Sequence, residues 1–241
     1  LGVSEHSMMA RVRAHAHFVH RFLRAYVLRG AIRRYYSIGD SHSGTLGREG
    51  FVVLHVGPVT AFRAGKQGEL VRLISRRMLG NRGARPPRWL VRLAIRRRDC
   101  VLLFFGEIDV RAHFSDRWKE YGSVQELARF LAGRLATQAS ELHRFTNARV
   151  GIASVTPAAE FEGDSALPTR GSIDERVLWT RLMNSALADA CRALGLPFVD
   201  TFSTYADEGG RLLPRVSDGT VHIRQDQADE MADSYRRAFS D

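Results

Sequence analysis

The chain is 241 residues long, carries a formal net charge of +10 and is 44% hydrophobic by residue count. A chain of this length and composition can fill one substantial core without disulfides or a structural metal. Its two cysteines, Cys100 in an apolar run and Cys191 in a helical pattern, lack metal-ligand spacing. We therefore expect buried, reduced thiols and a cytoplasmic location, with a disulfide as the less favoured alternative. We expect no metal and no cofactor.

Arginine supplies nearly all of the positive charge, since Lys66 and Lys119 are the only lysines. Arginines also interrupt every apolar stretch, so none approaches the roughly 20 residues that a membrane-spanning helix needs. Their dispersal favours solvated cations from a GC-rich coding bias over an anionic partner, and no motif predicts specific nucleic-acid binding. The chain begins at Leu1 and not at methionine, which leaves a removed leader or an upstream domain open.

Residues 1–33 are predicted to form a basic helical extension, because the stretch from Met8 to Arg34 carries an apolar stripe among arginines. Docking on its own domain is the favoured interpretation; an anionic ligand or a membrane surface is the alternative, which would make the protein membrane-peripheral. A helix turns His15 away from His17 and His20, which argues against a metal site.

From residue 34 to residue 241, short apolar runs alternate with amphipathic stretches, a pattern that predicts an α/β domain with a parallel sheet covered by helices. The five predicted strands are residues 34–38, 51–56, 100–105, 149–154 and 197–200. The predicted helices are residues 66–79, 89–97, 123–145, 172–194 and 226–239. Capping boxes at Ser123 and Ser172 predict where two of these helices begin, and residues 80–88 predict a loop.

Ligands bind beyond the carboxyl ends of the strands in an open parallel sheet, so the residues after each strand bear on function. Residues 39–43 (Gly-Asp-Ser-His-Ser) follow the first strand, and residues 106–113 (Gly-Glu-Ile-Asp-Val-Arg-Ala-His) follow the third. Residues 218–222 (Asp-Gly-Thr-Val-His) precede the last helix. These three blocks hold the candidate site residues.

In the kind and order of these blocks the chain resembles the SGNH (GDSL-type) hydrolase family, as a divergent member. The resemblance implies a five-stranded, flavodoxin-like three-layer sandwich. It also implies that Ser41 is the nucleophile, and that Asp218 and His222 complete a catalytic triad. A serine hydroxyl needs a base within hydrogen-bond reach, and an aspartate on the other ring nitrogen fixes the histidine tautomer. Asp40 is interpreted as a turn residue and not as a catalytic acid.

The family also holds the oxyanion with the nucleophile's amide, a glycine after the second strand and an asparagine in a Gly-x-Asn-Asp block. The resemblance assigns the glycine to Gly57. Ile108 stands in the asparagine position and cannot donate a hydrogen bond, which would cost about 3 kcal/mol of transition-state stabilisation. We expect Arg111 or His113 to supply the missing donor.

Other side chains of these blocks are candidates for substrate binding. They are His42, Glu107, Asp109 and Arg111. Trp179 and Tyr205 could stack on a sugar ring, although a core position is favoured for Trp179.

Two further departures separate the chain from the family pattern. Three residues lie between Asp218 and His222 where the family has two, which weakens the assignment of Asp218 and leaves Asp226 and Asp229 as poor substitutes. The interval between the first two strands is also too short for the family's long crossover helix. The assignment of Ser41 is unaffected by either.

Three functions stay open at this point. The favoured one is a serine esterase or acyl transferase acting on an acylated carbohydrate-type substrate. The second is a sugar transferase that uses a phosphorylated donor, with Glu107 or Asp109 as its base. The third is a non-catalytic assembly module tethered by the basic extension.

Overall fold

The computed structural model describes residues 32–79, 88–161 and 168–240. Nearly all of the helical extension predicted for residues 1–33, with its three histidines, lies outside these ranges, as does most of the predicted loop at residues 80–88. No helix in the described residues is long and apolar enough to cross a membrane.

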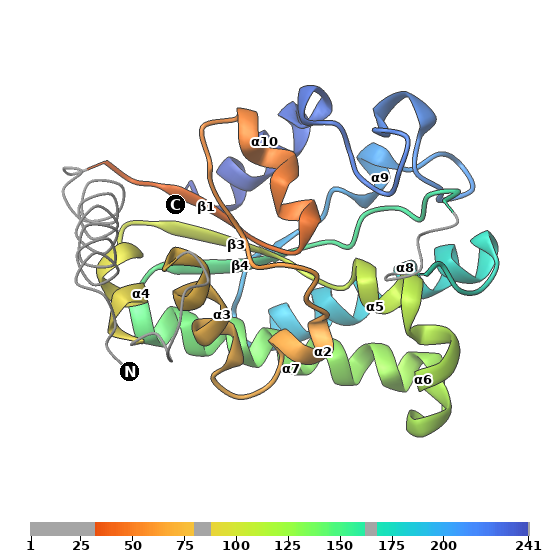
Figure 1. Ribbon diagram of the computed structural model, residues 1–241, viewed down its shortest axis with the longest axis horizontal. Helices are drawn as coiled ribbons and strands as arrows, with labels where there is room; N and C mark the ends of the chain where they lie inside the picture. Colours follow the sequence, from red (N-terminus) through yellow and green to blue (C-terminus); the bar gives the residue numbers. More distant parts are fainter. Residues whose placement is uncertain (1–31, 80–87, 162–167, 241) are drawn as a thin grey trace, which may run out of the picture.

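A parallel sheet of five strands forms the centre of the described part of the chain (Figure 1). The strands are β1 (Tyr35–Gly39), β2 (Val52–His55), β3 (Cys100–Phe104), β4 (Arg149–Ala153) and β5 (Phe198–Val199). They lie in the order β2-β1-β3-β4-β5, and each adjacent pair is parallel. The predicted fold class is confirmed, and each strand begins and ends within one residue of its predicted bounds.

Helices cover both faces of the sheet, which gives three layers (Figure 1). One face carries α2 (Ala61–Ala64), α3 (Glu69–Met78), α4 (Trp89–Ala94), α7 (Val124–Thr146) and α8 (Ile173–Ala193). The other carries the 3-10 helix η2 (Ser41–Arg48), α9 (Phe202–Tyr205) and α10 (Asp229–Ala238). The connecting segments contain four further helices of the described residues: α5 (Glu107–Ala112), α6 (Phe114–Tyr121), η3 (Pro214–Val216) and η4 (Gln225–Gln227).

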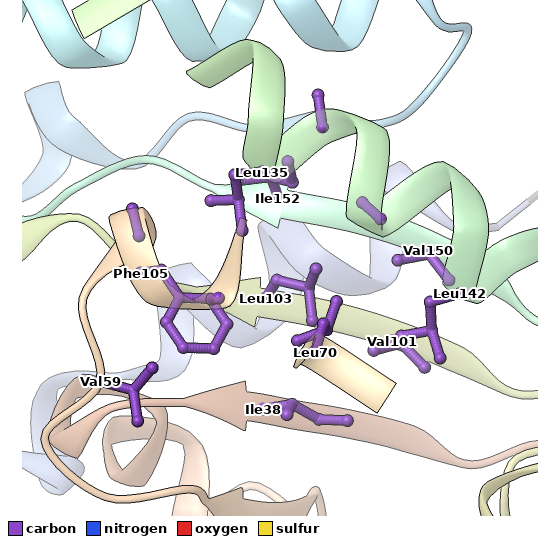
Figure 2. Close-up of a cluster of buried hydrophobic side chains, with 14 of the residues drawn as sticks. Ile38, Val59, Leu70, Val101, Leu103, Phe105, Leu135, Leu142, Val150 and Ile152 are labelled. Carbon is purple, nitrogen blue, oxygen red and sulfur yellow. The ribbon is translucent and has the colours of Figure 1, made fainter. Parts of the chain in front are cut away.

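The central strands bury alternate side chains in two separate cores, as a sheet covered on both sides must. Ile38, Leu103 and Ile152 point to the face of α7, where they meet Leu135 and Leu142 (Figure 2). Their neighbours in sequence pack on the opposite face, under α10. Cys100 and Cys191 are both buried and unpaired, as predicted.

The order of the strands creates a switch point beside β1. The chain leaves β1 for β2 on one side and returns to place β3 on the other. Connections that diverge in this way open a crevice at the carboxyl ends of the two central strands. As predicted, no long crossover helix joins β1 to β2; the connection contains the eight-residue η2.

Gly39 is required where β1 ends. A Cβ atom at this position would lie 2.0 Å from the carbonyl oxygen of Phe104, far inside the normal contact distance of a carbon and an oxygen atom. The close approach lets the amide of Asp40 donate to that same oxygen at 3.2 Å. The backbone of β1 and β3 is therefore pressed together immediately before Ser41.

The two predicted capping boxes differ in the structure. At Ser172 the box is complete, since the Glu175 side chain accepts from the Ser172 amide at 2.7 Å. At Ser123 only half is formed: the hydroxyl accepts from the Glu126 amide at 3.1 Å, but the Glu126 carboxylate pairs with Arg129. The box predicted at Ser123 was therefore wrong in its second half, because Arg129, one turn further along the helix, competes for the Glu126 carboxylate.

This difference is measurable in unfolding. Glu175→Ala should lower the free energy of unfolding by about 1 kcal/mol, because an N-terminal amide of α8 loses its partner. Glu126→Ala is the matched control and should change it by less than about 0.5 kcal/mol, since only an exposed ion pair is lost. Urea denaturation followed by circular dichroism gives both values, and equal losses would contradict the assignment.

Candidate active site

Ser41 is the first residue of η2, directly after β1, and it is exposed while its neighbours are buried. Asp40 caps the helix, as its Oδ1 accepts from the His42 amide at 3.0 Å. Ser43 stabilises the turn with two hydrogen bonds of 2.7 Å. Its hydroxyl donates to the Asp40 carbonyl, and its carbonyl accepts from Ser37 Oγ. The turn thus presents Ser41 to solvent at the switch point. The interpretation of Asp40 as a turn residue agrees with this geometry.

His222 reaches Ser41 from the other end of the chain. Its Nε2 lies 2.7 Å from Ser41 Oγ. The segment that carries His222 is a tight turn in which the Asp218 amide donates to the His222 carbonyl at 3.1 Å. Gln225 fastens this segment to η2 by donating to the Gly44 carbonyl at 2.9 Å. The structure therefore brings together the hydroxyl and the imidazole that the sequence pairs as nucleophile and base.

Asp218 lies on the far side of the His222 ring, but its contact is not the direct one that the family pattern implies. Asp218 Oδ2 is 3.4 Å from Nδ1. Thr220 Oγ1 stands nearer, at 2.9 Å from Nδ1 and 2.6 Å from Asp218 Oδ1. Asp226, the proposed substitute, pairs instead with Arg224 at 2.9 Å. Asp218 is thus the carboxylate that the structure places at His222.

A buried group of charges lies behind the His222 ring. The His42 ring centroid is 4.7 Å from that of His222, and His42 Nε2 is 3.5 Å from Glu107 Oε2. Glu107 in turn accepts from Arg111 Nε at 2.5 Å. His42 is only 3% exposed, so the predicted contact between His42 and substrate is wrong: the ring is covered by protein.

Within this group, the charge of one residue shifts the pKa of another. Burial opposes ionisation of Glu107, but His42 and Arg111 outweigh it and lower the pKa of Glu107 to about 2. Burial also opposes a charge on His42, yet the hydrogen bond and charge of Glu107, with Asp40, raise the pKa of His42. Burial raises the pKa of Asp40 to about 6. Glu107 therefore favours the protonated form of His42, and His42 favours the ionised form of Glu107.

His222 experiences the opposite influence. Burial, and then the positive charge of His42, lower the pKa of His222, and the nearby Asp218 only partly offsets them. The ring is consequently neutral at pH 7, with a lone pair available for a proton.

Asp109 has a structural part that the sequence did not suggest. It is 1% exposed, and its carboxylate accepts from the Ala61 amide at 2.5 Å and the Phe62 amide at 3.3 Å. These amides begin α2, so Asp109 joins the segment after β3 to the segment after β2 that carries Gly57. A direct contact of Asp109 with substrate, as predicted, does not fit this burial.

The candidates for oxyanion binding are placed less closely. Gly57 follows β2 at the same sheet edge as Ser41 and has a positive φ of 96°. Ile108 is buried, with 2% of its surface exposed. Arg111 is turned to Glu107, and His113 lies between α5 and α6. The expectation that Arg111 or His113 replaces the missing asparagine gains no support from these positions.

A cavity of about 470 Å³ opens over Ser41. It is lined by Ser41, Gly44, Thr45, Arg48, Asp218, His222, Ile223, Arg224, Gln225 and Asp226. Gly57, Arg111 and His113 are not among these residues. Polar and charged residues line it together with Gly44 and Ile223, and much of the lining belongs to the segment before α10, of which the sequence analysis had named Asp218, His222 and Asp226.

Neither aromatic considered for sugar stacking reaches this cavity. Trp179 is 5% exposed and packs against Phe114 with ring centroids 6.2 Å apart. Tyr205 is 2% exposed, and its hydroxyl is bonded to the Gln227 carbonyl and the Met231 amide. Both belong to the core, so the stacking interpretation is wrong for each.

The fold is similar to that of several solved structures. A protein of Bacteroides fragilis NCTC 9343 that is assigned as an acylhydrolase is 15% identical, with a TM-score of 0.57 over 93% of this chain and 95% of that one. A GDSL-like lipase from Bacteroides thetaiotaomicron VPI-5482 is 18% identical, with a TM-score of 0.55 over 93% and 96%. The chain has the SGNH hydrolase fold.

An acetylxylan esterase from Geobacillus stearothermophilus is also similar, at 13% identity and a TM-score of 0.50 over 88% of this chain and 96% of that one. No protein-family model and no curated protein matches the sequence. The likeness within the SGNH hydrolase fold is therefore one of architecture, with most of the side chains changed.

The buried ion pair of the site should stabilise the fold in a pH-dependent way. Glu107→Gln removes the carboxylate that faces His42 and Arg111 and should lower the free energy of unfolding by about 3 kcal/mol at pH 6. Because the folded pKa of Glu107 lies below its ordinary 4.5, this contribution is present above pH 4.5 and is lost as the pH falls toward 2.

The matched control is Glu160→Gln, which breaks an exposed pair with Arg211. It should cost less than about 1 kcal/mol at any pH. Urea denaturation at pH 6, 5 and 4 measures both variants. Losses of the same size in the two variants, or a Glu107→Gln loss that grows as the pH falls, would contradict the assigned charges.

Proposed function

We propose that this chain is a serine hydrolase of carboxylic esters, acting on small acyl groups carried by carbohydrate-type hydroxyls. The observation that carries the proposal is the 2.7 Å contact between Ser41 Oγ and His222 Nε2 at the switch point of the sheet. A hydroxyl bonded to a neutral imidazole is the arrangement that activates serine as a nucleophile. The similar fold of solved lipases and esterases supports the same reaction class.

The proposed reaction passes through an acyl-enzyme. Ser41 Oγ attacks the carbonyl carbon of the ester while its proton moves to His222 Nε2. The protonated ring then gives that proton to the departing alcohol oxygen, which leaves Ser41 acylated. Water, deprotonated by His222, attacks the acyl carbon and releases the acid and the free serine. A sugar hydroxyl in place of the water would give acyl transfer by the same steps.

The oxyanion is assigned to backbone donors. The Ser41 amide is the first of η2 and, within the described residues, has no acceptor. Gly57 at the neighbouring strand end supplies the second proposed amide. Because Ile108 contributes no donor, this site should be slower than one with three donors, by about 100-fold or more.

The form of the cavity supports a polar substrate. Its lining includes the side chains of Thr45, Arg48, Arg224 and Gln225, which can form hydrogen bonds with a hydroxyl-rich substrate. A small acyl group on a hydroxyl-rich alcohol suits such a surface, whereas a lipid does not. The acetylxylan esterase of similar fold acts on a substrate of this kind.

The other two functions lack such an observation. A sugar transferase would need Glu107 or Asp109 as a base, yet Glu107 is paired with Arg111 and His42, and Asp109 with two backbone amides. An assembly role through the basic extension rests on residues outside the described ranges.

Removal of the nucleophile tests the proposal directly. Ser41→Ala should abolish hydrolysis of 4-nitrophenyl acetate and of acetylated xylo-oligosaccharides, and should prevent labelling by a fluorophosphonate, because the hydroxyl that His222 activates is lost. Ser185→Ala, an exposed serine on α8, is the control and should behave as wild type. Turnover in Ser41→Ala equal to that of the control would refute the proposal.

The pH dependence tests the base. Only the neutral His222 ring can take the serine proton, so kcat/KM should rise with pH and level off once the ring is deprotonated. Since burial and His42 lower the pKa of His222, the half-maximal rate should fall below pH 6.5. Initial rates with 4-nitrophenyl acetate between pH 4.5 and 8.5 give the profile, with Asp189→Asn on the distant face of α8 as control. A midpoint above pH 7 would contradict this assignment.

A further inference from the structure

The hydroxyl of Thr220 lies between the carboxylate and the imidazole of the proposed triad. Thr220 Oγ1 is 2.6 Å from Asp218 Oδ1 and 2.9 Å from His222 Nδ1. The direct approach of the charged pair, Asp218 Oδ2 to His222 Nδ1, is 3.4 Å. Two hydrogen bonds of ordinary length thus run through threonine, while the direct one is longer than such bonds usually are.

The number of protons fixes the direction of both bonds. An ionised carboxylate only accepts, so the single hydroxyl proton of Thr220 is donated to Asp218. The hydroxyl oxygen then faces His222 with its lone pairs and accepts from Nδ1–H. The proton of the neutral ring is thereby held on Nδ1, and the lone pair on Nε2 is left toward Ser41 Oγ.

We propose that Thr220 is a positioning residue, whose hydroxyl transmits the influence of Asp218 to His222 and holds the ring in the tautomer that activates Ser41. The proposal deepens the function given above and rests on it. It assigns a task to a residue that neither the sequence pattern nor the resemblance singled out.

The local backbone explains why a bridge is needed. Three residues separate Asp218 from His222, and their backbone closes through the bond from the Asp218 amide to the His222 carbonyl. In this turn the Thr220 amide also donates to Asp218 Oδ1, at 2.9 Å. The Ser217 hydroxyl donates to the Thr220 carbonyl at 3.1 Å. Threonine is therefore held at both ends of its backbone, with its hydroxyl inside the gap.

Solvent adds a second reason. The Asp218 side chain is 39% exposed and that of His222 is 29% exposed. Water can compete for a long, partly exposed ion pair and weakens it. A hydroxyl fixed in the gap excludes that water and completes two bonds that share one oxygen.

Two substitutions separate the hydroxyl from the shape of the side chain. Thr220→Val keeps the branched shape and removes the hydroxyl; it should lower kcat for 4-nitrophenyl acetate about 10- to 100-fold with KM nearly unchanged. Thr220→Ser keeps the hydroxyl and should stay within about threefold of wild type. Thr137→Val, an exposed threonine on α7, is the control for the exchange itself and should have no effect.

The partner of the hydroxyl is tested by a double variant. If Thr220 acts through Asp218, then Thr220→Val combined with Asp218→Asn should be no slower than Asp218→Asn alone. Multiplied losses in the double variant would show that the hydroxyl acts independently of Asp218 and would overturn the proposal.

A measurement that needs no turnover keeps this test separate from that of the proposed function. NMR titration of the His222 ring should show a lower midpoint in Thr220→Val than in wild type, because the protonated ring has lost an acceptor on Nδ1. Wild type, Thr220→Ser and Thr137→Val should share one midpoint. If Thr220→Val also shares it, the proposal fails whether or not the protein hydrolyses esters. If the midpoint falls but wild type has no Ser41-dependent activity, the proposed function fails while the hydrogen-bonded bridge stands.

Discussion

The contact between Ser41 and His222 joins two points 181 residues apart in the chain, and the rest of the structure serves to hold them together. A bond of 2.7 Å leaves little tolerance, so each partner must be fixed to the same rigid support. That support is β1. Ser41 leaves its carboxyl end through a turn, and α10, which follows His222, is fastened to it where Tyr235 donates to the Tyr36 carbonyl at 2.8 Å.

Behind this contact the protein places a charged group that is costly to bury. His42, Glu107 and Arg111 lie largely out of water, and the contacts of Glu107 with His42 and Arg111 offset the cost of burying its charge. Their effect is felt at His222, since the positive ring of His42 stands against it and disfavours a second positive charge. His42 lowers the pKa of the His222 ring and Asp218 partly offsets this effect. The ring is therefore a base that is neutral at physiological pH.

The departures from the usual pattern of the fold are met locally. The longer spacing between Asp218 and His222 leaves a gap, and a hydroxyl occupies it. In the block after β3, Ile108 is in the core and Asp109 accepts from the first amides of α2. The missing oxyanion donor is different, because within the described residues no side chain is seen to take its place at Ser41. The cavity over Ser41 is formed largely by the segment before α10.

The sequence by itself determined the strands, the principal helices and the pairing of Ser41 with His222. Apolar runs bounded by turn residues indicate strands that are buried on both faces of a sheet. The blocks at the strand ends indicate a chemistry from residue types and order alone, without any distances. Only the tertiary structure decided which polar residues of the blocks are exposed. His42 follows Ser41 directly yet is buried, and Asp109 in the block after the third strand is buried as well, because a change of one position along a turn moves a side chain from solvent to core. Thr220 takes its position from the closed turn and from hydrogen bonds whose directions depend on one hydroxyl proton. Contacts of this kind leave no periodic pattern in a sequence.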